Sequence, residues 1–241
     1  MQSKLKTDIC MTAEELRQAQ KDIQDKILLC AKENKLTSDE IQPIYDGIYD
    51  IEKYLTSSPR IMWILKEPYD DFTPEGKPTG GDWMIYEAFD NNDAWKNKTW
   101  RPMIYATYGV FHGSNYREMD DISDNRDMVN VLKQVAYINI SKMPANSQSN
   151  DNDIQIKYNI WKPIIMEQIV LYNPQIIIFG NTFKYFKSDL VGNETEPTKR
   201  IDGVIHVYEK EGKKLIDVYH PNQRIINHEL YIDSIIRSCL Y

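Results

Sequence analysis

Residues 60–69 read RIMWILKEPY, a short apolar run that opens directly onto a charged turn. The five consecutive apolar residues at 61–65 are typical of a strand that is buried on both faces of a parallel sheet. This strand must end before Pro68, because proline has no backbone N–H and disfavours helical conformation in the residue before it. Ligands of open α/β sheets bind beyond the carboxyl ends of the strands. The stretch therefore predicts a central strand and a site at residues 66–69.

Composition indicates an ordinary globular protein and argues against a protein that grips duplex nucleic acid. The chain has 241 residues, of which 41% are hydrophobic and 27% charged, as in ordinary globular proteins. We expect a cytoplasmic protein with no membrane partner, because no signal peptide and no apolar run of about 20 residues is present. Three scattered cysteines without a CxxC pair predict neither disulfides nor a cysteine metal site. The net charge of −7 argues against a protein that grips duplex nucleic acid over a broad basic face.

Two helical patterns precede the central strand. Thr12 and Glu15 form a capping-box pattern, so a helix is expected from there to about residue 34. Apolar residues at three- and four-residue spacing predict a second helix over 39–55. We interpret residues 1–57 as a helical extension packed on a core formed by 58–241, within one structural domain.

The rest of the chain alternates between helical and strand patterns. Strands are predicted at 135–140 and 175–180 and a hairpin at 204–208 and 214–219, with helical patterns at 84–91, 101–111, 125–134, 154–172 and 227–239. This alternation predicts an α/β fold: a three-layer α/β/α sandwich with a mainly parallel central sheet and N-terminal helices, the hairpin adding an antiparallel edge.

Four polar turns, taken in order, resemble the motifs of the uracil-DNA glycosylase superfamily. They are LKEPY at 65–69, YINISKMP at 137–144, NPQIIIFGN at 173–181 and HPNQR at 220–224. The resemblance covers about residues 58–240. It implies a uracil-DNA glycosylase-like fold and a hydrolase that extrudes a deaminated or damaged base, uracil or a relative, from single- or double-stranded DNA. Such an enzyme cleaves the N-glycosidic bond with water, and neither a cofactor nor a metal is expected.

The resemblance assigns roles to residues near the first motif. Glu67 stands at the position of the family's catalytic acid, which balances positive charge on the sugar in an oxocarbenium-like state. Lys66, Pro68 and Tyr69 are expected to contact the substrate. Trp83 stands where the family has an aromatic that stacks on the base. The plain alternatives are a surface ion pair between Glu67 and Lys66, and a core indole at Trp83.

The later motifs supply the remaining roles. Asn139 matches a strand-end asparagine that reads the base through its donor and acceptor atoms. His220, the second catalytic candidate, matches a histidine that donates a hydrogen bond to the base oxygen gaining negative charge. Asn222 is expected to hold a phosphate, and Arg224 to fill the gap left by the extruded nucleotide. The alternatives are a turn asparagine, a histidine ending a strand, and a solvated charge.

Departures from the motifs keep other functions open. The glycine of the family's first motif is replaced by Leu65, so a divergent or inactive member that binds another nucleobase-like ligand or nucleic acid is the alternative. A nucleotide-binding protein that uses residues 180–182 is a third class. Asp217, His220 and His228 do not have the spacing of a known metal site. DNA binding further requires a shared basic face, for which the sequence offers Lys66, Lys77, Lys142, Lys184, Lys187 and Arg224.

Overall fold

A computed structural model describes residues 11–90, 93–145 and 150–241. Within these residues one mixed sheet has the strand order β1-β3-β2-β4-β7-β6-β5. The central pairs β3-β2, β2-β4 and β4-β7 are parallel, and the pairs toward both edges are antiparallel. The strands are β1 (Gly47–Ile48), β2 (Ile61–Leu65), β3 (Ala136–Asn139), β4 (Ile176–Gly180), β5 (Lys199–Ile201), β6 (Ile205–Lys210) and β7 (Lys213–Val218).

The predicted central strand is confirmed. Strand β2 lies between β3 and β4, and all five of its residues are buried. Its alternate side chains face two different cores, as a strand covered on both faces requires. The predicted hairpin is also confirmed as β6 and β7, with β5 extending its antiparallel edge.

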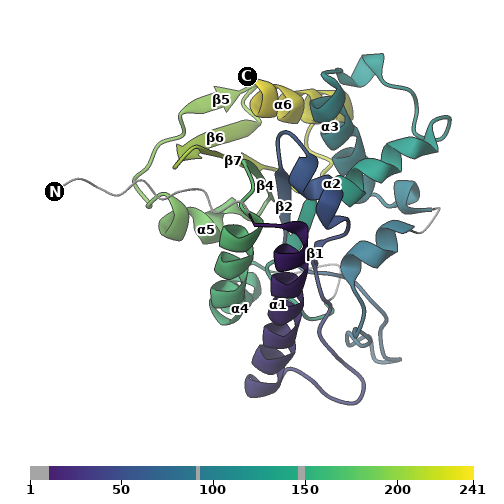
Figure 1. Cartoon of the computed structure of the whole chain (residues 1–241), viewed down its shortest axis with the longest axis vertical. Coiled ribbons are helices and arrows are strands. Elements are labelled where there is room, and N and C mark those ends of the chain that lie inside the picture. Colours follow the sequence, from purple (N-terminus) through teal and green to yellow (C-terminus); the bar gives the residue numbers. More distant parts are fainter. Residues whose placement is uncertain (1–10, 91–92, 146–149) are drawn as a thin grey trace.

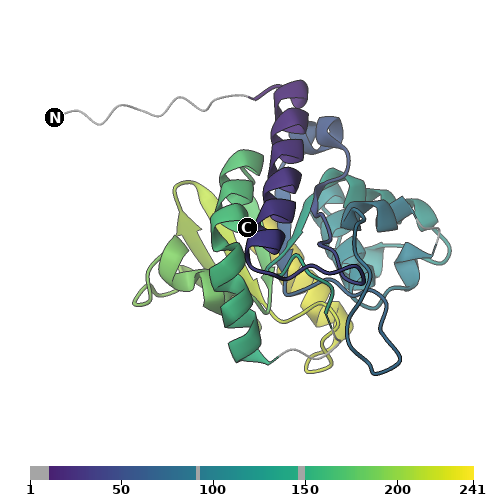
Figure 2. The same ribbon diagram turned by 90° about the horizontal axis from the view of Figure 1, so that it is seen from below.

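Helices cover both faces of the sheet (Figure 1), an arrangement compatible with a three-layer α/β/α fold. Helices α1 and α4 lie side by side on one face, together with α2 and α5 (Figure 2). The other face carries α3, α6 and short 3-10 segments. The bounds are α1 (Ala13–Glu33), α2 (Ile51–Thr56), α3 (Trp100–His112), α4 (Asp151–Tyr172), α5 (Phe183–Leu190), α6 (His228–Leu240), η1 (Ile85–Asp90), η2 (Ala94–Lys96), η3 (Tyr116–Glu118) and η4 (Arg126–Gln134).

The predicted helix over 39–55 is wrong. Only α2 is helical there, and residues 40–45 run beside the loop that leads to Trp83, exchanging backbone hydrogen bonds with residues 80–85. Pro43 and Gly47, the latter at φ 153°, interrupt the helix that the apolar spacing predicts. The segment then adds β1 to the sheet edge. The helices predicted over 84–91 and 125–134 correspond to the 3-10 segments Ile85–Asp90 and Arg126–Gln134, and residue 91 lies outside the described residues.

The parallel strands end at one edge of the sheet, and the polar turns gather there. In Figure 2 the loop of residues 69–82 and the turn after β7 project on the same side of the molecule. No helix among the described residues combines the length and apolar character needed to cross a bilayer.

Candidate functional site

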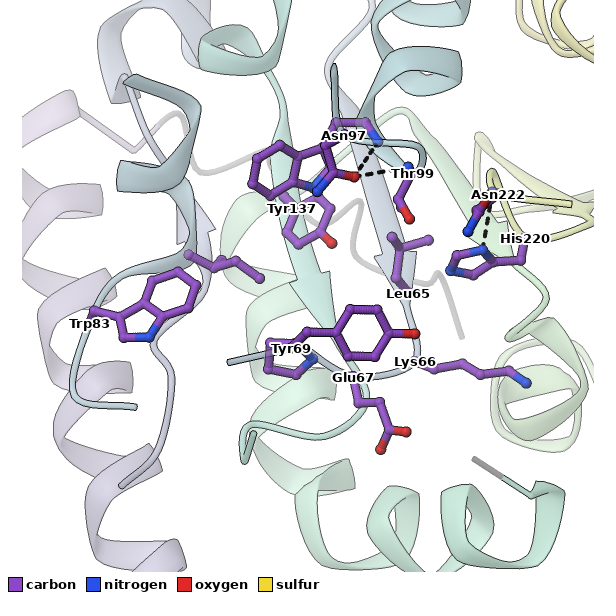
Figure 3. Close-up of a pocket in the computed structure, with 13 residues that line it drawn as sticks. Leu65, Lys66, Glu67, Tyr69, Trp83, Asn97, Thr99, Tyr137, His220 and Asn222 are labelled. Atoms are coloured by element: carbon purple, nitrogen blue, oxygen red, sulfur yellow. Dashed lines mark hydrogen bonds between the residues drawn. The ribbon is translucent and has the colours of Figure 1, made fainter. Parts of the chain in front are cut away.

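A cavity of about 450 Å³ opens at the carboxyl ends of the central strands. Its walls come from the turn after β2, the loop before η1, the start of α3, strand β3 and the turn after β7 (Figure 3). Segments that lie more than 150 residues apart in the chain, such as Leu65 and His220, therefore share one site. Of the sequence-predicted site residues, the lining includes Lys66, Glu67, Pro68, Tyr69, Trp83, His220 and Asn222.

The first motif contributes a ring and a carboxylate that point in different directions. The Tyr69 ring lies at the centre of the lining, with Trp83 and His220 on opposite sides of it (Figure 3). The Glu67 carboxylate points away from that ring. It is buried and forms an ion pair with Lys157 of α4, not with Lys66 as the plain alternative expects. Lys157 is a site neighbour that no sequence motif marks.

Lys66 lines the cavity and extends toward the start of α4. Its ammonium lies 3.9 Å from an oxygen of Asp151. Burial lowers the pKa of Lys66, although Asp151 opposes this effect. Lys184 contacts the same carboxylate, so one negative charge is shared by two ammonium groups and this corner keeps a net positive charge.

His220 is held as a neutral imidazole. Its Nδ1 accepts a hydrogen bond from the backbone N–H of Asn222 at 3.1 Å. Burial, and to a smaller extent the nearby positive charge of Lys66, lower the pKa of His220 to about 4. At neutral pH the ring proton therefore sits on Nε2, because Nδ1 is the acceptor. This geometry leaves the Nε2–H free to donate to a ligand.

Asn139 does not line the cavity but lies directly behind its wall. It stands opposite Leu65 in the sheet and shares a face with Tyr137, and both of those residues line the cavity. Its side chain is buried, and neither the Oδ1 nor the Nδ2 atom has a hydrogen-bond partner within 3.5 Å among the described residues, although the amide lies close enough to the Tyr137 hydroxyl to oppose the rise of its pKa. A buried amide without a partner costs free energy, so such groups need an explanation in a native structure.

Aromatic side chains form much of the remaining wall. Trp83 is fixed by a hydrogen bond from its Nε1 to Asp70 Oδ2 at 2.7 Å. Trp100 and Tyr137, which the sequence motifs do not single out, complete the aromatic lining. Burial raises the pKa of Tyr137, so its hydroxyl remains protonated and can act as a donor.

The start of α3 positions Trp100. Asn97 Oδ1 accepts hydrogen bonds from the backbone N–H groups of Thr99 (2.9 Å) and Trp100 (3.2 Å), and all three residues line the cavity. Asn97 lies four residues before the predicted helix over 101–111, and asparagine is a preferred capping residue at helix starts. That signal could have drawn attention to this wall.

One member of the predicted basic face, Lys142, does not reach the surface. Lys142 is fully buried in an ion pair with Asp46, so it cannot contact a phosphate. Its long side chain points inward and pairs with the buried carboxylate of Asp46, a contact that the sequence does not predict. Lys66 and Lys184 share the carboxylate of Asp151. Arg224 is exposed and is not among the residues that line the cavity.

Within the described ranges, no group of three histidine, cysteine or acidic side chains is placed to hold a metal ion. Comparison of the chain with protein-family models and with curated proteins finds no significant match. The resemblance to the uracil-DNA glycosylase superfamily therefore rests on the motifs themselves.

Proposed function

We propose that the cavity binds an unpaired nucleobase and that the protein hydrolyses the N-glycosidic bond of that base. One observation carries the proposal: a buried, unpartnered amide, that of Asn139, lies behind the wall of an aromatic cavity that also contains a neutral histidine. A nucleobase edge supplies the donor and acceptor that this amide lacks. The motif resemblance to glycosylases points the same way.

The aromatic walls suit a planar ligand. Tyr69 is half exposed, and with Trp83 and Trp100 it surrounds a space of about 450 Å³. Stacking of a base on such side chains contributes roughly 1–3 kcal/mol per base. To meet the Asn139 amide, the edge of the base must pass the side chains of Leu65 and Tyr137, so we expect these two to shift on binding.

The reaction divides between two groups. Water adds to C1′ of the sugar, and the electrons of the breaking C1′–N bond leave with the base. The proton that the water loses is taken up by the departing base anion, so the products are the sugar hydroxyl and the neutral base. The His220 Nε2–H donates to the base oxygen on which negative charge develops, without itself carrying a charge. The Glu67 carboxylate supplies negative charge for the oxocarbenium-like sugar, and its ion pair with Lys157 holds it in place.

The charge distribution favours a small or single-stranded substrate over duplex DNA. Duplex binding depends on several cationic side chains that neutralise phosphates together. Here Lys142 is buried, and Lys66 and Lys184 share the single carboxylate of Asp151, which offsets only one of their two charges. A base that is already unpaired also spares the protein the cost of extruding it.

Base binding without hydrolysis is the second candidate function. It is favoured by the ion pair between Glu67 and Lys157, because this pair holds the carboxylate away from the Tyr69 ring. In that case His220 and Asn139 recognise the base, and no bond is broken.

Oligonucleotides that contain uracil, hypoxanthine or xanthine, each single- and double-stranded, test the proposal. The free base released is measured by chromatography, and strand scission is measured after alkali treatment. We expect release from single strands that falls at least 100-fold in His220→Ala, since loss of one such donor costs about 10²–10³ in rate. His112→Ala is the matched control, because His112 is an exposed histidine at the end of α3. Release that persists in His220→Ala and Glu67→Ala contradicts the assigned roles, and binding without release selects the second function.

A further inference from the structure

A fully buried polar cluster lies next to Asn139, on the side away from the cavity residues. It consists of Asp46, Lys142 and Gln168, which come from the segment before β1, the turn after β3 and helix α4. Lys142 and Gln168 are 0% exposed and Asp46 is 1% exposed. A lysine is almost never buried to this extent unless it is paired.

Every charged atom in the cluster is matched. Lys142 Nζ lies 2.8 Å from both oxygens of Asp46 and 2.9 Å from Gln168 Oε1. The Gln168 amide also donates to Asp46 Oδ1 at 2.9 Å. A buried ion pair with complete hydrogen bonding holds its members in one geometry.

The same ion pair holds the backbone of Asn139 at both ends. The Asn139 N–H donates to Asp46 Oδ2 at 2.7 Å, and the Asn139 carbonyl accepts from Lys142 Nζ at 2.8 Å. Apart from its approach to the Tyr137 hydroxyl, the Asn139 side chain makes no hydrogen bond within 3.5 Å to the described residues. Its direction therefore depends on the backbone that these two charged groups fix.

The chain path explains why a side chain, and not the backbone of a neighbouring strand, accepts the hydrogen bond of the Asn139 N–H. The register that places Gly47 opposite Tyr137 would place Tyr45 opposite Asn139 if β1 continued. Instead, the Tyr45 N–H bonds to the Trp83 carbonyl at 2.9 Å, on the aromatic wall of the cavity. The carboxylate of Asp46 replaces the missing strand as acceptor for Asn139. Residues 45 and 46 thus connect the aromatic wall with the buried amide.

We propose that the ion pair between Asp46 and Lys142 is a positioning device that aims the Asn139 amide at the bound base. This inference rests on the proposed base-binding function. Stability alone does not account for the pair, because well-packed apolar residues in place of a buried ion pair are often equally or more stable. Both residues act through Asn139 and touch no ligand.

The informative variant is the neutral double substitution Asp46→Asn/Lys142→Met. It keeps an acceptor for the Asn139 N–H and removes the charges and the contact to the Asn139 carbonyl. Lys142→Met alone leaves a buried carboxylate unpaired and is expected to fold poorly. The matched control is Gln20→Met, since Gln20 also bonds both backbone groups of a β1 residue, Ile48, but does not touch Asn139.

Affinity for free uracil, hypoxanthine and xanthine is measured by calorimetry for these variants. We expect the double variant to bind the preferred base about tenfold more weakly, as loss of one well-aimed hydrogen bond implies. Adding Asn139→Ala to it should cause no further loss beyond that of Asn139→Ala alone, because both act through one amide. Wild-type affinity in the double variant, or losses that add, overturn the proposal. Gln20→Met should bind like the wild type, and an equal loss there also contradicts it.

A second readout does not depend on any ligand. The order parameter of the Asn139 side-chain amide, measured by NMR relaxation, should be high in the wild type and low in the double variant. If the wild type binds none of the three bases, the proposed function fails, and this measurement still decides the positioning role. An unchanged order parameter in the double variant contradicts that role.

Discussion

Replacing Asn139 with leucine should stabilise the protein and weaken base binding at least about tenfold. Leucine has the same number of side-chain heavy atoms as asparagine, and the site is 1% exposed and flanked by Leu65 in the neighbouring strand. The substitution removes two amide atoms that have no partner among the described residues and keeps the backbone bonds to Asp46 and Lys142. A residue that lowers stability where it stands is retained for another reason.

The magnitude follows from the cost of burying unmatched polar groups. A buried donor or acceptor without a partner costs about 1–3 kcal/mol. We expect Asn139→Leu to raise the free energy of unfolding by about 1–3 kcal/mol, since apolar packing replaces that cost. For a chain of this size each kcal/mol corresponds to roughly 2–4 °C in Tm.

Urea unfolding followed by circular dichroism measures the change, and Thr182→Val is the matched control. The Thr182 hydroxyl is also fully buried beyond a strand end, β4, but it donates to the Ile64 carbonyl at 2.9 Å. Its loss should therefore lower the free energy of unfolding by about 0.5–1.5 kcal/mol. If Asn139→Leu lowers stability as much as Thr182→Val does, the amide is satisfied in the free protein, and its role as an unfilled recognition group is refuted.

Three further predictions concern charged and titratable groups. Lys142→Met should lower the free energy of unfolding by about 3–5 kcal/mol, because it leaves Asp46 buried without its partner. Urea unfolding measures this change, and a loss below about 1 kcal/mol contradicts the prediction. The His220 ring, followed by NMR, should titrate near pH 4. Because this pKa lies below the unfolded value near 6.5, its contribution of at most about 3 kcal/mol to the free energy of unfolding is present above pH 6.5 and lost as the pH falls toward 4. A midpoint between 6 and 7 contradicts the burial of His220. Glu67→Gln should leave base affinity within about threefold and slow base release by at least about 100-fold, because the carboxylate is assigned to the charged transition state. Binding and release are measured on the same oligonucleotide. An equal loss of affinity and rate assigns Glu67 to binding instead.

The sequence predicts the strands of this fold well because they are short and strongly apolar. Residues 61–65 have no polar member, so only a strand covered on both faces can bury them. The helix predicted over 39–55 is wrong, because the spacing of its isoleucine and tyrosine residues resembles that of a helix. There, backbone bonds to the loop at residues 80–85 outweigh local preference.

The site could be predicted only in part, for a physical reason. Motif order identifies the turn residues that line the cavity, such as His220 and Tyr69, because strand ends converge in a parallel sheet. The partners of the charged groups depend on long-range packing instead. Neither the burial of Lys142 against Asp46 nor the pairing of Glu67 with Lys157 is visible without coordinates.

The most direct measurement follows the Asn139 side-chain amide by NMR while free uracil, hypoxanthine or xanthine is added. If the amide reads the base, its two proton resonances shift and saturate with one of these bases, and Asn139→Leu binds that base at least about tenfold more weakly. An amide that does not respond while a base binds, or the absence of binding by all three bases, contradicts a nucleobase site behind Leu65 and Tyr137.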